Sequence, residues 1–396
     1  RCKRMAVPGG RHRKITTLDA PEQAPRGDRG GFDNSLAAGN LPRCHPFKIV
    51  NPFTAVLSMR HLRLIRLAPA FLLALPLSLG AQVLDLTINN TGIAIGDKPR
   101  VNGLRINFRD RKLDHVNGAN ITVWSPYEPP SGVVHGFAIG LPATGAKNIT
   151  GISVGVLGVG AQNSISGMSI GGAGIGSGGE LRGIMLGGIG VGSGGGIHGL
   201  SLGLIGVGSG GPIRGIQVGG IGVGGGSELS GISIGGIGAG GAGRVSGLAI
   251  GGIGVGGGGG ITGIGIGGIG VGSGGDVNGL MIGGVGVGSG GMLQGVAIGG
   301  AGVGAPRIKG LAIGGLGVGG ADVHAIVLTA GYFKIEDRGR FDGTALASVS
   351  NIRGAQHGLT IGLFNYANQL HGAQIGLINV SDNGGRRRVL PLLSVR

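Results

Sequence analysis

Residue patterns that could bind a nucleotide occur in this sequence, but their setting does not favour such a site. The motif Gly-x-Gly-x-x-Gly matches many times; in dinucleotide-binding proteins it follows a strand, opens a helix and precedes an acidic residue. Glycine makes up 99 of the 396 residues, so chance alone produces such matches. No phosphate-binding Gly-Lys-Ser or Gly-Lys-Thr loop is present. We therefore expect no cofactor site.

The pattern closest to a metal site is the calcium-binding repeat Gly-Gly-x-Gly-x-Asp, whose aspartates coordinate calcium inside a β-roll. The equivalent segment at residues 187–193 reads Gly-Gly-Ile-Gly-Val-Gly-Ser and has no aspartate. Both cysteines, Cys2 and Cys44, lie upstream of an apolar segment with the features of an export signal. The sequence therefore predicts no metal ligand, and no disulfide in the exported chain.

Titratable and nucleophilic side chains do not converge on a catalytic group. Glu180, Glu228 and Asp276 are expected at turns in well-separated repeats, so their spacing does not predict a carboxylate pair. Serines recur periodically at predicted turns: Ser193, Ser209, Ser273 and Ser289. Histidines mostly take an outward polar position near the start of a repeat: His115, His135, His198, His324, His357 and His371. We expect no catalytic residue and no enzyme.

The formal net charge of +16 would suit a nucleic-acid-binding protein, but its distribution does not. Residues 1–58 carry ten Lys and Arg against four Asp and Glu, whereas residues 82–396 carry twenty against thirteen. Aromatic residues are only 3% of the chain, so no basic stripe offers rings on which bases could stack. We expect no nucleic-acid partner.

Residues 59–81 have the features of a cleaved signal peptide. A basic start beginning at Met59 leads into an apolar run of about a dozen residues that ends near Ala81. Pro69 and Pro76 interrupt the run, which is also too short for a membrane-spanning helix. Residues 1–58 are basic and aperiodic, and we interpret them either as a gene-calling extension ahead of Met59 or as a disordered arm.

A repeat of sixteen residues dominates the rest of the chain. Each unit opens with Gly-Φ-x-Φ-Gly, where Φ is aliphatic, and a strict period of this kind is typical of repeat architectures. The residue before the opening glycine is polar and is predicted to point outward; the residue before that is aliphatic and is predicted to point inward. Glycine at nearly every second position excludes a helix. The regularly spaced opening glycines are Gly151, Gly167, Gly183, Gly199, Gly215, Gly231, Gly247, Gly263, Gly279 and Gly295.

The repeat predicts an all-β protein, with a parallel β-solenoid as the favoured architecture. Five aliphatic residues of each unit are expected in the interior, yet one unit buries too little to offset the entropy of ordering it, so units must stack. A bend is expected at the Gly-Gly pair after each strand. An outer-membrane β-barrel and an antiparallel β-meander remain alternatives. Regular repeats are assigned to residues 151–325, flanked by irregular ones at 82–150 and 326–385, with a basic tail at 386–396.

Two C-terminal units change character. They read Gly358-Leu-Thr-Ile-Gly-Leu-Phe-Asn365 and Gly372-Ala-Gln-Ile-Gly-Leu-Ile-Asn379. These units resemble the Gly-Leu-Gln-Ile-Gly-Leu-Ile-Asn repeats of a bacterial surface-repeat family known from leptospiral surface proteins. The resemblance is good over residues 340–396 and loose over the central repeats. It implies an exported, envelope-associated repeat protein and brings no enzymatic activity with it.

Two less regular patches are the places where a localised partner-binding site is expected if the protein has one, with packing or capping as the alternative role of their aromatic residues. One contains Trp124 and Tyr127 within a proline-containing loop, and the other contains Tyr332 and Phe333. The whole sequence predicts an exported, non-catalytic protein with a structural or binding role at the outer membrane or cell surface. Periplasmic or secreted locations remain open, as does association with a membrane. An outer-membrane barrel that confers permeability or anchoring is the alternative function.

Overall fold

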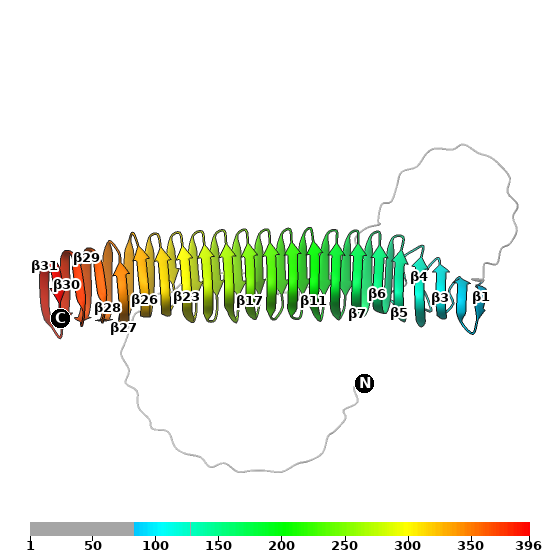
Figure 1. The fold of residues 1–396 in the computed structure, drawn as a ribbon, viewed down its shortest axis with the longest axis horizontal. Coiled ribbons are helices and arrows are strands. Elements are labelled where there is room, and N and C mark those ends of the chain that lie inside the picture. Colours follow the sequence, from blue (N-terminus) through cyan, green and yellow to red (C-terminus); the bar gives the residue numbers. More distant parts are fainter. Residues whose placement is uncertain (1–82, 127) are drawn as a thin grey trace, which may run out of the picture. The chain divides into compact units, whose positions relative to one another are not determined.

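The computed structural model describes residues 83–126 and 128–396, which form one continuous stack of short strands (Figure 1). The predicted signal peptide at 59–81 and the extension at 1–58 lie outside the described residues. Successive repeats pair parallel and in register, so that Gly183 lies beside Gly199 and Gly199 beside Gly215. The chain is a β-solenoid of about 18 turns, which confirms the favoured architecture. Parallel stacking selects it over the two alternatives.

Thirty-one strands make up the described chain. Most coils contain one longer strand of seven or eight residues and one short strand of about four. In chain order the strands are β1 Leu84–Ile88, β2 Thr91–Ile95, β3 Arg100–Asn107, β4 His115–Thr122, β5 Val133–Gly140, β6 Ala143–Gly155, β7 Gly158–Gly171, β8 Gly174–Ser177, β9 Glu180–Gly187, β10 Gly190–Ser193, β11 Gly196–Gly203, β12 Gly206–Ser209, β13 Ile213–Gly219, β14 Gly222–Gly225, β15 Leu229–Gly235, β16 Gly238–Gly241, β17 Arg244–Gly251, β18 Gly254–Gly257, β19 Gly260–Gly267, β20 Gly270–Ser273, β21 Val277–Gly283, β22 Gly286–Ser289, β23 Met292–Gly299, β24 Gly302–Gly304, β25 Arg307–Gly314, β26 Gly317–Thr329, β27 Tyr332–Leu346, β28 Val349–Gln356, β29 Leu359–Leu370, β30 Ala373–Asn383 and β31 Arg386–Val395.

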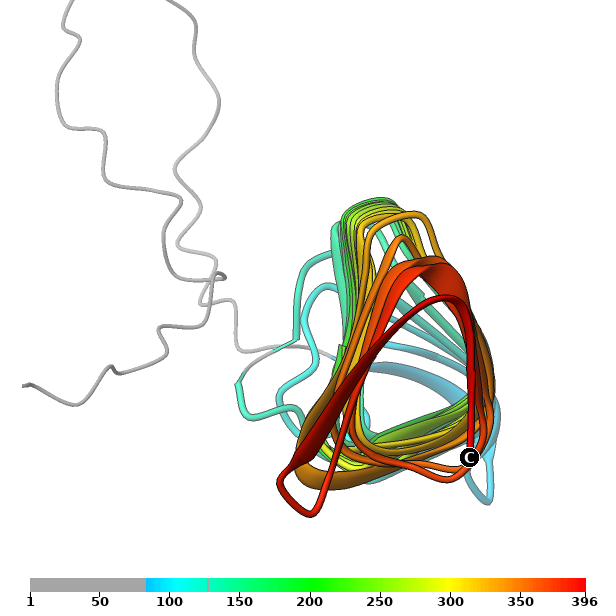
Figure 2. The same ribbon diagram turned by 90° about the vertical axis from the view of Figure 1, so that its left-hand side faces the viewer.

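Each coil has a roughly triangular outline when viewed along the solenoid axis (Figure 2). In the coil of β9 and β10, the first corner lies at the opening glycine, Gly183, whose φ of 112° is a conformation that residues with a Cβ rarely adopt. The second corner follows β9 at the Gly188-Ile189 turn, where a bend was predicted. The third lies at Gly194-Gly195. Three faces result, and the first two share one bent strand.

Three columns of side chains fill the interior. The aliphatic residue two places before the opening glycine is buried in every regular coil, as predicted; Leu181, Ile197 and Ile213 are examples. The middle residue of each Gly-Φ-x-Φ-Gly unit forms the second column, and the central residue of each short strand, such as Val191, forms the third. The columns touch along the axis, so the core is continuous and no coil is an independent unit.

The prediction that five aliphatic residues per repeat lie inside is wrong. In the coil of β11 and β12, Ile197, Ser201 and Val207 are buried, whereas Leu202 and Ile205 are 37% and 52% exposed. Alternation continues through the opening glycine without a change of phase, so the two Φ residues lie on the same side of the strand as the polar residue before that glycine. The narrow triangular interior accepts only the small or flexible residues of the x position.

Both ends of the solenoid are closed by an antiparallel strand. β1 pairs antiparallel with β2, and β31 pairs antiparallel with β30. The segment expected to be a basic tail is therefore mostly strand, with Arg386, Arg387 and Arg388 at its start. Charged residues on an end strand oppose further edge-to-edge pairing, which otherwise favours aggregation.

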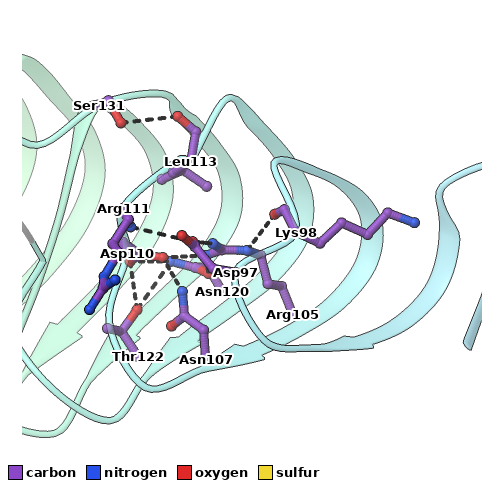
Figure 3. A network of polar contacts seen from close by, with 10 residues as sticks. All are labelled: Asp97, Lys98, Arg105, Asn107, Asp110, Arg111, Leu113, Asn120, Thr122 and Ser131. Carbon is purple, nitrogen blue, oxygen red and sulfur yellow. Dashed lines mark hydrogen bonds and ion pairs between the residues drawn. The ribbon is translucent and has the colours of Figure 1, made fainter. Parts of the chain in front are cut away.

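Buried polar residues replace the apolar columns near the two ends. In the C-terminal coils, Asn365 and Asn379 occupy the column that valine fills centrally, and the Asn365 side-chain amide donates a 2.9 Å hydrogen bond to the Asn379 carbonyl. In the N-terminal coils, Arg105 takes the x position and is fully buried (Figure 3). Its guanidinium binds the carboxylates of Asp97, at 2.6 Å, and of Asp110.

Candidate functional site

The second face of the solenoid carries two exposed columns of aliphatic side chains. They are the two Φ residues of each Gly-Φ-x-Φ-Gly unit, for example Ile184 and Leu186, and we call this surface the apolar face. None of the Φ residues is buried in the regular coils. Ile216, at 45% exposed, and Ile264, at 40%, show how open the columns are. Over the regular coils the apolar face comprises Ile152, Val154, Met168, Ile170, Ile184, Leu186, Leu200, Leu202, Ile216, Val218, Ile232, Ile234, Leu248, Ile250, Ile264, Ile266, Leu280, Ile282, Val296, Ile298, Leu311, Ile313, Ile326 and Leu328.

The apolar face carries no charged residue at these positions in any described coil. In-register pairing extends both columns in the N-terminal direction to Ile93 and Ile95 on β2, and in the C-terminal direction to Ala373 and Ile375 on β30. Thr344 is the one polar residue in these two columns. The two columns thus form one long exposed apolar patch. Such a patch is unusual, because exposed apolar patches on monomeric proteins rarely exceed a few hundred Å².

The other two faces differ from the apolar face in chemistry. The first face is polar, and its ions pair locally: Arg182 with Glu180 at 2.5 Å, and Arg214 with Glu228 at 3.3 Å. The third face presents glycine at its outward positions from Gly158 to Gly319, because each short strand reads Gly-Φ-Gly with only the middle residue inside. The apolar face is thus the only one of the three whose outward side chains are almost all aliphatic.

The predicted patch at Trp124 and Tyr127 is described only in part. Trp124 lies in the loop between β4 and β5, is 52% exposed and stacks on Phe108 with 6.5 Å between ring centroids. Tyr127 lies outside the described residues. The exposed pair of rings is compatible with contact to a partner, but the structure adds no polar group that would identify one.

The predicted pair Tyr332 and Phe333 is divided between surface and core. Tyr332 is 39% exposed, whereas Phe333 is fully buried and packs edge-on against Phe341 with 4.9 Å between ring centroids. Neighbouring residues of a strand point to opposite sides, so both could not face one partner. Phe333 is therefore a core residue, and its assignment to a binding patch is corrected.

A shallow cleft of about 460 Å³ lies beside Tyr332 on the third face. It forms where the outward glycines end: Gly317 pairs with Tyr332, and the following coils place Val349 and Phe364 in the same column. The side-chain amide of Asn351 donates a 2.5 Å hydrogen bond to the Tyr332 hydroxyl. Of the residues that line the cleft, only Tyr332 was predicted from the sequence; the change from glycine to an aromatic or aliphatic residue at the equivalent positions of the C-terminal coils is the signal that points to Val349 and Phe364. The cleft is lined by Tyr332, Asp337, Val349, Asn351, Arg353, Phe364, Tyr366 and Asn368.

Substitutions at the two neighbouring aromatic residues should separate their roles. We expect Phe333→Leu to lower the stability of the C-terminal coils by about 1–2 kcal/mol, since it removes ring contacts inside the core. Tyr332→Leu should change stability by less than about 0.5 kcal/mol. Thermal unfolding followed by circular dichroism checks both variants, and equal losses would contradict the assignment.

Histidines gather on the polar face of the C-terminal coils. Asp342 lies between His324, whose Nδ1 is 2.9 Å away, and His357, whose Nδ1 is 3.6 Å away; Arg340 binds the same carboxylate at 2.7 Å. His357 stacks on His371 with 4.9 Å between ring centroids. These side chains point outward, as predicted. Within the described residues, no three His, Cys, Asp or Glu side chains are placed to hold a metal ion.

Comparisons with protein-family models, with curated proteins and with solved structures gave no match for this chain. In residues 83–396, leaving out 127, no helix is long and apolar enough to span a membrane. The apolar face, with its length and absence of charge, is the feature that a function must explain.

Proposed function

We propose that this protein is an exported, non-catalytic structural component of the bacterial envelope or cell surface, and that the apolar face is its working surface. The observation that carries the proposal is the uninterrupted run of exposed aliphatic side chains on consecutive coils. A free protein with such a surface would aggregate, because nothing polar interrupts it. The face must therefore be covered when the protein acts.

The proposed location is supported by features of the sequence. Residues 59–81 have the basic start, apolar run and small-residue end of a signal peptide. The units at Gly358 and Gly372 resemble repeats of a leptospiral-type surface family, which supports a place at the outer membrane or cell surface. The regular stack of coils suits a structural role, because in-register pairing places the two aliphatic Φ residues of every coil in the same two columns along the axis.

Fractionation of cells tests location and face together. The full chain, expressed in a bacterium with two membranes, should be recovered with the envelope, and deletion of residues 59–81 should leave it in the cytoplasm. Three lysines on the apolar face, Ile216→Lys, Ile232→Lys and Leu248→Lys, should release the exported protein into a soluble fraction.

The matched control places three lysines on the polar face of neighbouring coils, at Ser230, Ser246 and Thr262. Each of these side chains precedes an opening glycine and so lies on the polar face, across the corner from the apolar face; this variant should stay with the envelope. Recovery of the unaltered full chain in the cytoplasm would refute the proposed location. Equal release of both lysine variants would refute a role for the apolar face.

A further inference from the structure

We propose that the apolar face is covered by a second copy of this chain, packed face to face to give a closed dimer. This inference rests on the proposed function and specifies its partner. Three properties of the apolar face carry it: the area, the absence of charge and the regular spacing of its side chains. A fourth, the composition of its edges, argues against the main alternative partner, a lipid surface.

The area is large enough for a stable dimer. About 18 coils at the usual strand spacing of ~4.8 Å give a length of ~85 Å. A strand segment of four residues spans ~13 Å, so one face offers ~1,100 Å². Two copies would bury ~2,200 Å² in total, against ~1,600 Å² for a typical specific interface. The dimer therefore needs no contribution from the other two faces.

The absence of charge makes the apolar face compatible with itself. A two-fold dimer places the same patch of both copies in contact, so a charge in the patch would be buried against aliphatic side chains of the other copy without a partner. The regular coils carry none there, while the polar face of the same coils carries Arg182, Arg214 and Lys309. The apolar face therefore carries no charge whose burial would oppose the packing of a second copy.

The spacing of the side chains also matches only a regular partner. Ile216, Ile232 and Leu248 occupy one column at successive coils, separated by the strand spacing. A second copy has the same spacing, so its side chains can lie between those of the first along the whole length, as in the dry interfaces between paired sheets. A globular partner with an irregular surface would fit a few coils and leave the rest exposed.

The edges of the apolar face do not suit a lipid surface. Proteins that lie in a membrane interface place Trp, Tyr, Lys or Arg along the boundary of the apolar region. One edge runs along the opening glycines, where among the regular coils the preceding residue is Lys or Arg only at Arg182, Arg214 and Lys309. The other edge is formed by turns that carry aliphatic residues such as Ile189, 54% exposed, and Ile253, 50% exposed. The second edge extends the apolar surface and supplies no anchor for lipid headgroups.

The mass of the purified full chain in detergent-free buffer tests the proposal. Light scattering coupled to size-exclusion chromatography should give twice the mass of one chain. The variant with Ile216→Lys, Ile232→Lys and Leu248→Lys should be a monomer, with a dimer dissociation constant raised by more than ~100-fold, because like charges would be brought together without water. The variant with Ser230→Lys, Ser246→Lys and Thr262→Lys should remain a dimer.

Cross-linking locates the contact if the triple lysine variant fails to fold. Facing sheets lie ~10 Å apart, too far for a direct disulfide, whose Cα atoms are within ~7 Å, so a short bis-maleimide is the suitable reagent. With Cys2 and Cys44 changed to Ser, Ile232→Cys near the middle of the solenoid should cross-link two copies, whereas Ser230→Cys should not. Equal cross-linking of both overturns the proposal.

Other outcomes overturn the dimer while separating it from the proposed function. An unaltered chain that is monomeric at micromolar concentration, or that forms an open series of larger oligomers, refutes the closed dimer. If that monomer floats with vesicles of phosphatidylethanolamine and phosphatidylglycerol, the apolar face serves a lipid surface and the envelope role survives. A monomer that neither binds vesicles nor fractionates with the envelope refutes both proposals.

Discussion

Replacing one corner glycine by valine, Gly231→Val, is expected to unfold the coils around β15. Gly231 has a φ of 108°, and a Cβ there would lie 2.1 Å from the backbone oxygen of Gly215 on the preceding coil. The backbone conformation alone costs an L-residue about 1–3 kcal/mol. The clash is with backbone and cannot be relieved by rotating a side chain, so we expect a total loss above ~4 kcal/mol.

A second glycine in the preceding coil provides the control. A Cβ on Gly224, at an outward position of β14, would meet no atom within 4 Å, and its φ is not in the left-handed region. Gly224→Val should therefore change stability by less than about 0.5 kcal/mol. Hydrogen exchange resolved by coil is the appropriate measurement, because a stack of repeats can unfold in parts. Equal loss of protection in both variants would contradict the corner role of Gly231.

Removing the buried arginine of the N-terminal coils should produce the second large effect. In Arg105→Met, the carboxylate of Asp110, which is 5% exposed, loses the guanidinium that neutralises it. The Arg105 guanidinium also donates hydrogen bonds to the Asn120 side chain at 2.8 Å and to the Lys98 carbonyl at 2.8 Å. Breaking a buried ion pair at one partner typically costs about 3–5 kcal/mol, so β2, β3 and β4 should lose amide protection.

Another arginine of β3 is the matched control for this substitution. Arg100 binds Asp114 at 2.5 Å, but both side chains are more than half exposed. A surface pair of this kind contributes about 0–1 kcal/mol. Arg100→Met should leave the protection of β2–β4 almost unchanged. A small effect of Arg105→Met would mean that Asp97 and Asp110 find other partners, and the network in Figure 3 would not be a stabilising element.

Side-chain direction along the repeat could have been predicted more fully than it was. Leu181 lies two residues before the opening glycine and points inward, Arg182 points outward, and alternation then continues through Gly183. The same alternation places Ile184 and Leu186 outside and Met185 inside. Assigning aliphatic residues to the core by hydrophobicity alone gave the wrong side, because this coil has more aliphatic residues than its interior can hold.

Only part of the cleft at Tyr332 could be predicted from the sequence. Tyr332 was identified from its aromatic character in an irregular segment, and it does line a cleft. Phe364 and Tyr366 join it only because parallel stacking places residues of β27, β28 and β29 side by side. The C-terminal coils differ in length. The residues that stack on Tyr332 can therefore be identified only when the number of residues in each of these coils is known. Phe333 lies on the opposite side of the strand from Tyr332, so aromatic character alone does not distinguish the surface residue from the core residue.

The sequence by itself determined the repeat length, the all-β class and the inward aliphatic column that includes Leu181 and Ile197, since a strict period lets equivalent residues of all coils share one interior. Only the tertiary structure decided that the coils stack parallel, that the opening glycine turns a corner and that the Φ columns face outward. The reason is geometric. A period of two residues fixes which side chains share a side of a strand, but the size of the closed coil decides which side becomes the interior.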